Sequence, residues 1–224
     1  MGSRTQTVER LTRLDTLRLL GRHIGLDFAN TVDPRHGVHP RDYLGDYADL
    51  VAWGRHASLL TEGDVRHLSD EAARRPAEAT AIFERAIAVR ETIYRVFSAR
   101  ARGVAPRGAD LDALHSAYVA ALTHARIVPT ADGCAWTWRE DVDALDRMLW
   151  PVVRSAVDLL TADEAARVKE CPGSDGCSWL FLDTSKNGSR RWCSMEGCGS
   201  RVKMRRHYAR HRGEAVTARA HREH

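Results

Sequence analysis

The sequence has no apolar run long enough to cross a membrane and no apolar stretch near its beginning that would mark a secretory signal. A membrane-spanning helix needs about 20 predominantly apolar residues, and the uncharged apolar runs in this chain are much shorter. Residues 1–23 mix acidic and basic side chains, which is not the pattern of a signal sequence. We therefore expect a cytoplasmic protein without a membrane partner.

Motifs of several common enzyme classes are also missing. The chain has no phosphate-binding loop, no GxSxG turn, no HExxH helix and no GxGxxG turn. The seven histidines of residues 1–185 are scattered rather than clustered. His36 and His39 share a loop with Asp33 and Asp42, which admits a second metal or anion site, although a solvated loop is the simpler interpretation. No catalytic group can be assembled, so we expect no enzymatic activity.

Lysine is scarce, with only three among the 34 basic residues. Arginine therefore prevails along the whole chain, and its use in one segment is not by itself evidence of phosphate binding. The distribution of charge is more informative, because residues 1–185 carry 23 basic and 27 acidic side chains, whereas residues 186–224 carry 11 and 3. A basic end of this kind indicates a polyanion partner, most often nucleic acid, although a solvated tail also fits.

Apolar periodicity predicts a mainly helical body. Between residues 77 and 100 apolar side chains recur at steps of three and four, which places them on one face of a helix. Residues 20–33 fit either a short strand or the start of a buried helix. Residues 126–138 predict a hairpin, with Cys134 as a small buried residue of its second strand. Further helices are expected over 42–60, after Thr61 as N-cap, over 108–124, and after a capping box at 161–164. Residues 140–160 are also expected to be helical, with Pro151 kinking or dividing the element or starting a second helix.

Four of the five cysteines lie within 28 residues, as the close pairs Cys171-x5-Cys177 and Cys193-x4-Cys198. Structural zinc sites use two such pairs of thiolates, each on a tight turn, and glycines accompany both pairs. The fifteen residues between the pairs predict a hairpin with a Lys-Asn-Gly-Ser turn, as in a zinc ribbon. We expect one structural zinc ion with four cysteine ligands and no open coordination position.

Two other uses of the cysteines stay open. Disulfides would require an oxidising compartment, which nothing in the sequence suggests. Cys193 and Cys198 could instead join His207 and His211 in a two-cysteine, two-histidine finger. Only eight residues separate Cys198 from His207, where about twelve are usual, so four thiolates are preferred.

The segment CSWLFLDTSKNGSRRWCSMEGCGSR (177–201) resembles the CGNR zinc finger family, named for a Cys-Gly-Asn-Arg tetrapeptide. Upstream, LDFANT (26–31), YADLVAW (47–53) and RETIYRVFSAR (90–100) resemble the ABATE domain that precedes this finger. Members of the family look like bacterial transcription regulators. In this chain the tetrapeptide reads Cys-Gly-Ser-Arg, and the serine can still cap the following helix.

The resemblance implies an architecture and a ligand set. A helical ABATE-like sensing domain is expected over 1–167, a CGNR-type finger with a basic helix over 168–214, and a disordered tail over 215–224. The fold class is then mainly α with a small β-hairpin, ending in a zinc-ribbon-like finger. The implied zinc ligands are Cys171, Cys177, Cys193 and Cys198.

The basic helix is expected to begin at Arg201, with Ser200 as its cap. Met204, Tyr208 and His211 form a narrow stripe that we expect to pack on the zinc knuckle. The remaining surface is cationic and favours double-stranded DNA over RNA, since no spread of aromatic side chains suggests base stacking. The expected DNA-contacting residues are Arg190, Arg191, Arg201, Lys203, Arg205, Arg206, Arg210 and Arg212.

Asp27, Asn30 and Thr31 are polar residues in an apolar segment, so they either brace the domain or line a ligand pocket together with Tyr47 and Trp53. The hypothesis is a zinc-dependent, DNA-binding transcription regulator with a ligand-sensing domain; a small-molecule effector and a homodimer are both admitted. The alternative is a small-molecule-binding or sequestering protein whose finger is structural or contacts protein. A tight small-molecule complex without DNA affinity would distinguish that alternative.

Overall fold

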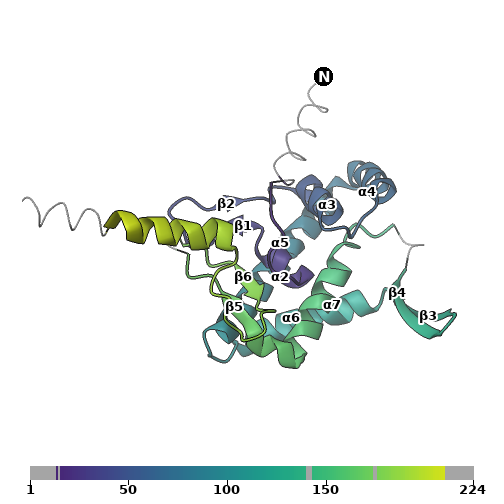
Figure 1. Cartoon of the computed structure of the whole chain (residues 1–224). Helices are drawn as coiled ribbons and strands as arrows, with labels where there is room; N and C mark the ends of the chain where they lie inside the picture. The colour runs from purple at the N-terminus through teal and green to yellow at the C-terminus, as the bar shows by residue number, and fades with distance from the viewer. Residues whose placement is uncertain (1–13, 15, 140–142, 174–175, 210–224) are drawn as a thin grey trace, which may run out of the picture.

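The computed structural model describes residues 14, 16–139, 143–173 and 176–209. Most of these residues lie in helices (Figure 1). Three short antiparallel strand pairs accompany them. The fold class is therefore confirmed as mainly α with small β elements and a C-terminal cysteine cluster. The helices are α2 (Ile24–Ala29), α3 (Tyr47–His56), α4 (Glu62–Arg74), α5 (Pro76–Ala101), α6 (Gly108–Leu122) and α7 (Leu149–Thr161). The strands are β1 (Val32–Asp33), β2 (Arg41–Asp42), β3 (Ala125–Thr130), β4 (Gly133–Trp138), β5 (Val168–Glu170) and β6 (Leu180–Leu182).

The long helix α5 is the centre of the fold. It begins with Pro76 at its first position, where a missing N–H has no cost, and it confirms the helix predicted over 77–100. Its buried face includes Ile93 and Phe97 and packs against α2, α3, α4, α6 and α7, as well as against β5. One continuous core therefore runs from the helices into the cysteine-rich segment.

The structure decides one open prediction in the N-terminal half of the chain and confirms another. Residues 24–29 form the buried helix α2 rather than a strand. Thr61 caps α4 as predicted: its hydroxyl accepts the N–H of Asp64 at 3.2 Å, and the Asp64 carboxylate accepts the N–H of Thr61 at 2.8 Å. This reciprocal pair is a capping box.

Two helix predictions further along the chain were wrong in part. The helix predicted over 140–160 begins only at Leu149. Pro151 lies in its first turn, where proline is tolerated, which agrees with the alternative that Pro151 starts a helix. Thr161 does not open a capping box; it is the last residue of α7, and its hydroxyl donates to the carbonyl of Val157 at 2.9 Å. The short 3₁₀ helix that follows, Asp163–Arg167, has no side-chain cap.

The hairpin β3–β4 is confirmed, but Cys134 is exposed rather than buried. The hairpin stands at one end of the molecule (Figure 1), and Trp136 is 54% exposed. Trp138 approaches Trp150 of α7, with 5.9 Å between ring centroids. Since the hairpin packs mainly on itself, its second strand provides no buried position for the cysteine.

No helix within the described ranges combines the length and the apolar character that a membrane crossing requires.

Candidate metal centre and basic helix

Four buried thiols meet at one point, and their geometry fits a metal ion. The sulfur atoms of Cys171, Cys177, Cys193 and Cys198 all lie within 4.8 Å of one another. Cys177 and Cys193 have their sulfurs 3.7 Å apart, and Cys193 and Cys198 have theirs 3.6 Å apart. In a tetrahedral zinc site with Zn–S bonds of about 2.3 Å, the sulfurs are about 3.8 Å apart. The four predicted ligands are therefore positioned to bind one metal ion.

The surroundings lower the pKa of Cys171 and Cys198 and raise the pKa of Cys177 and Cys193, so two of the four thiols are biased toward the ionised form that metal binding requires. Hydrogen bonds from the thiols of the other three cysteines lower the pKa of Cys171 below its ordinary value. The backbone N–H of Cys193 also donates to this sulfur, at 3.4 Å. Arg201 places its Nη2 atom 3.7 Å from the sulfur of Cys198, where its positive charge offsets part of the charge of the thiolates.

The first cysteine pair lies at the end of a hairpin different from the predicted one. β6 pairs with β5, with Glu170 opposite Leu180, so the hairpin encloses Cys171 and Cys177. The predicted return strand before Cys193 is wrong, because the described residues after the turn at 185–188 form no strand. The buried Asp183 carboxylate folds this segment by accepting the backbone N–H groups of Ser185 at 2.9 Å and Arg190 at 3.0 Å.

The second cysteine pair lies where a helix begins. Ser194 is the N-cap, and its hydroxyl accepts the N–H of Gly197 at 3.1 Å. A π-helical turn, Met195–Gly199, then continues as α-helix over 200–209. The prediction that Ser200 caps the helix was wrong: Ser200 is helical, and its hydroxyl donates to the carbonyl of Met195 at 3.0 Å. Cys198 is thus carried by the helix itself.

Two family models match the chain. The ABATE model, described as "Putative stress-induced transcription regulator", matches residues 22–163, and the CGNR zinc finger model matches residues 167–211. The chain belongs to the ABATE family. A search of curated proteins finds no match to it. Both matches agree with the resemblance noted in the sequence.

The helix after the CGNR knuckle is exposed along its length. Met204 and Tyr208 are 55% and 62% exposed, so the prediction that they pack on the knuckle was wrong. Figure 1 shows why, since the helix over 200–209 leads away from the ABATE domain. Its described cations are all exposed, namely Arg201, Lys203, Arg205 and Arg206. The predicted contacts Arg210, His211 and Arg212 lie outside the described residues.

Arg190 and Arg191, the two predicted DNA contacts before the helix, differ in their surroundings. The guanidinium of Arg190 donates to the carbonyls of Leu20 at 3.2 Å, Leu182 at 3.3 Å and Trp192 at 3.0 Å. It also lies over the ring of Phe181, 4.4 Å from the centroid. Arg191 is exposed, and its guanidinium carbon lies 5.7 Å from the centroid of the Trp192 ring. Arg190 therefore ties the finger together and joins it to Leu20, just before the ABATE match, while Arg191 faces solvent.

The polar residues of the LDFANT segment are bonded within the fold. Asn30 forms two hydrogen bonds of 2.8 Å with the backbone of Leu180 in the finger. Asp27 accepts the N–H of Gly21 at 2.7 Å, and burial raises the pKa of Asp27 to about 6. Thr31 donates to the carbonyl of Phe28 at 2.9 Å. Of the two roles considered for these residues, the contacts support bracing.

The loop between β1 and β2 holds the first knuckle rather than a second metal. The N–H of His36 donates to the carbonyl of Gly176 at 2.8 Å, and that of Arg35 donates to the carbonyl of Cys177 at 3.0 Å. Asp42 accepts two hydrogen bonds from Arg90, of 2.7 and 2.8 Å. Within the described ranges the four cysteines are the only cluster of potential ligands close enough to share an ion.

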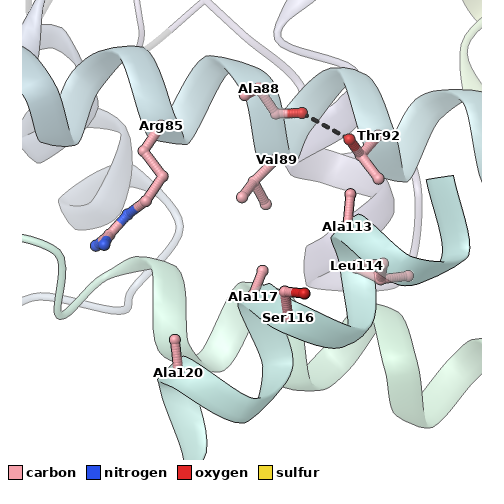
Figure 2. A pocket seen from close by; sticks show the side chains of 9 residues that line it. All are labelled: Arg85, Ala88, Val89, Thr92, Ala113, Leu114, Ser116, Ala117 and Ala120. Carbon is pink, nitrogen blue, oxygen red and sulfur yellow. Dashed lines mark hydrogen bonds between the residues drawn. The ribbon is translucent and has the colours of Figure 1, made fainter. Parts of the chain in front are cut away.

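Grooves of ligand size lie between described helices of the ABATE domain. One, of about 390 Å³, lies between α5 and α6 and is lined mainly by small apolar side chains, with Arg85 at one end (Figure 2). Another, of about 620 Å³, lies beside α3, α4 and α5 and includes Tyr47, whose hydroxyl donates to the carbonyl of Leu145 at 2.7 Å. Trp53, the other predicted lining residue, is fully buried against Phe28.

Proposed function

We propose that this protein is a cytoplasmic transcription regulator, not an enzyme, that binds double-stranded DNA through its CGNR finger and the following basic helix. The observation that carries the proposal is the exposed helix over 200–209, which leads away from the zinc knuckle (Figure 1). Its described cations, Arg201, Lys203, Arg205 and Arg206, are all exposed. Lys203 and Arg206 make no ion pair with any described residue. Cations without carboxylate partners are available for phosphates.

The shape of this helix suits the major groove of DNA. That groove is about 12 Å wide and admits one α-helix, and the side chains of the helix over 201–209 are exposed apart from half-buried Val202. Exposed Met204 and Tyr208 would lie among the basic side chains, where apolar groups can contact thymine methyl groups. The cations would contact phosphates and set the position of the helix on the duplex.

Zinc would act by holding this helix in place. Cys193 precedes the helix and Cys198 lies in its first turn, so a metal ion shared with the first knuckle fixes where the helix starts. Four thiolates leave zinc no open coordination position for a substrate. The metal therefore supplies structure to the DNA-binding element.

The α5–α6 groove is the place we propose for an effector, a small and largely apolar molecule. Its lining offers apolar contacts, since the hydroxyl of Thr92 already donates to the carbonyl of Ala88 at 2.9 Å (Figure 2). The same helix α5 also holds the knuckle loop, through an ion pair of 2.7 Å between Glu91 and Arg35. A ligand that shifts α5 would therefore act on the residues that support the finger.

DNA binding is tested by titrating the zinc-loaded protein into a labelled duplex across a salt series. If about five phosphates are contacted, log affinity should fall with log salt with a slope of roughly −4 to −5. The double variant Lys203→Ala/Arg206→Ala should bind at least about tenfold more weakly with its zinc content unchanged. The control Arg66→Ala changes an exposed arginine on α4 and should bind normally. Absence of binding by the wild type at low salt would refute the proposal.

The effector site is tested with small aromatic and aliphatic probes in thermal-shift titrations. Ala117→Phe fills the groove, so probes that stabilise the wild type should not stabilise this variant. Thr80→Phe, in the other groove, is the matched control. Equal stabilisation of all three proteins would place the probes elsewhere.

A further inference from the structure

Arginines of the ABATE domain are mostly paired with carboxylates, and two exposed ones near the finger are not. Arg22 and Arg41 are both exposed and form no ion pair with any described residue. The guanidinium of Arg41 lies over the ring of Tyr43, 4.8 Å from its centroid. A ring does not neutralise the charge of Arg41, and this side chain is exposed to solvent. Pairs elsewhere in the domain include Arg35–Glu91, Arg55–Glu62, Arg75–Glu78, Arg85–Asp146, Arg90–Asp42, Arg95–Asp110 and Arg147–Asp64.

Arg22 lies beside the finger. Its neighbour Gly21 accepts the N–H of Leu182 from β6 at 2.9 Å. Arg22 is also close enough to Arg190 to influence it: burial, and then the positive charge of Arg22, lower the pKa of Arg190. Since the guanidinium of Arg190 is bonded to backbone carbonyls, Arg22 is the arginine of this pair that can reach a ligand.

Arg41 lies beside the start of the basic helix. Figure 1 shows β1 and β2 next to this end of the helix. Asp33 of β1 lies opposite Arg41 in the strand pair and lines one hollow together with Arg201. Burial raises the pKa of Asp33, the charges of Arg201 and Arg41 oppose that shift, and the charge of Cys198 adds to it. One carboxylate thus faces two guanidinium groups. The other nearby acid, Asp42, is occupied by Arg90.

The backbone at Arg22 gives a second, independent observation. Its φ angle is +60°, in the left-handed region that glycine adopts most readily. Backbone outliers of this kind persist where the surrounding structure enforces them, and they cluster at functional sites. The chain carries arginine at position 22, although the backbone conformation there favours glycine.

We propose that Arg22 and Arg41 extend the DNA-binding surface onto the ABATE domain, where they contact backbone phosphates beside the duplex segment entered by the basic helix. This inference rests on the proposed DNA-binding function. Proteins that place a helix in the major groove commonly hold the flanking phosphates with residues from other elements. The surface is assembled before binding, because Asn30 and Val32 bond to Leu180 and Trp179 of the finger.

The test measures affinity and salt dependence for one duplex with the full-length, zinc-loaded protein. Arg22→Ala/Arg41→Ala should weaken binding about tenfold or more at moderate salt and reduce the salt slope by about 1.8, since each lost phosphate contact removes about 0.9. Arg22→Lys/Arg41→Lys keeps both charges and should retain the wild-type slope. The control Arg66→Ala/Arg74→Ala removes the same charge from α4 and should leave the slope unchanged.

Each outcome is decisive. A loss of slope in the alanine pair with retention in the lysine pair and the control supports the inference. An unchanged alanine pair overturns it, and the proposed function still stands if Lys203→Ala/Arg206→Ala binds weakly. An equal loss in the α4 control overturns it as well, since net charge alone would then explain the effect. Arg22→Gly suits the backbone at this position, so weak binding by this variant cannot be attributed to misfolding.

Discussion

Asn30 of α2's C-terminal end and Leu180 of the finger are joined by a matched pair of hydrogen bonds. The Asn30 amide donates to the Leu180 carbonyl, and its carbonyl accepts the Leu180 N–H, each at 2.8 Å. An asparagine side chain thereby pairs with a backbone residue 150 positions away. This contact makes the ABATE domain and the CGNR finger parts of one folded unit.

Replacing this side chain should destabilise the whole protein. Asn30→Asp removes the donor and places a carboxylate against the Leu180 carbonyl in a buried site. We expect the free energy of unfolding to fall by about 2–3 kcal/mol, the typical cost of a buried group left unsatisfied. Urea unfolding measures this change. Thr80→Ala removes an exposed hydroxyl that donates within α5 and should cost less than about 0.5 kcal/mol.

Removing zinc should lower the stability of the ABATE domain as well as that of the finger. The four thiols belong to the same continuous core as the helices. Cys198→Ser, or treatment with a chelator, should lower Tm by roughly 10 °C or more, since metal binding contributes several kcal/mol and 1 kcal/mol shifts Tm by about 2–4 °C. Cys134→Ser changes the exposed cysteine and should keep one zinc per chain and the wild-type Tm. A normal Tm without zinc would contradict this view.

Gly176 should tolerate no side chain, because the loop between β1 and β2 lies against it. Its φ is +72°, and a Cβ atom would lie 2.5 Å from the carbonyl oxygen of His36. Gly103 has the same φ with open space around it. Gly103→Ala should therefore cost about 1–2 kcal/mol from the backbone alone, and Gly176→Ala clearly more. Chemical denaturation compares the two variants, and equal losses would show that the loop moves aside freely.

Arg190 and Arg191 should separate stability from DNA binding. Arg190→Ala leaves four backbone carbonyls without their donor, and we expect it to cost about 2 kcal/mol of stability. Arg191→Ala removes an exposed side chain and should leave Tm unchanged while weakening binding to the duplex. Paired thermal unfolding and binding measurements check both expectations. A loss of stability in Arg191→Ala and normal stability in Arg190→Ala would contradict this assignment.

Asp27 should make stability depend on pH. Burial raises its folded-state pKa to about 6, although the N–H of Gly21 partly opposes the shift. The folded protein therefore holds this proton more tightly than the unfolded chain, so this group's contribution is greatest below about pH 4 and falls as pH rises to about 6. Asp27→Asn should remove the dependence and be more stable than the wild type at pH 7 by about 1–3 kcal/mol. Urea unfolding of both proteins at pH 5 and pH 7 tests this, and a constant difference between them would contradict it.

Local patterns in the chain were sufficient for part of the structure. The spacing of the four cysteines predicted the ligand set, the apolar steps along 77–100 predicted α5, and the turn near Gly133 predicted the hairpin β3–β4. Each of these depends on residues close together in the sequence. The basic character of residues 186–224 is likewise visible from composition.

Other features were decided only by contacts between distant segments. β6 pairs with β5 because Asn30 and the β1–β2 loop hold the first knuckle. The basic helix starts at Ser194 rather than Ser200, since Cys198 must reach the other thiols from within its first turn. The sequence by itself therefore determined which residues bind metal and which carry charge. Tertiary structure alone decided which side chains are buried and which polar groups pair, because both depend on neighbours that are far away along the chain.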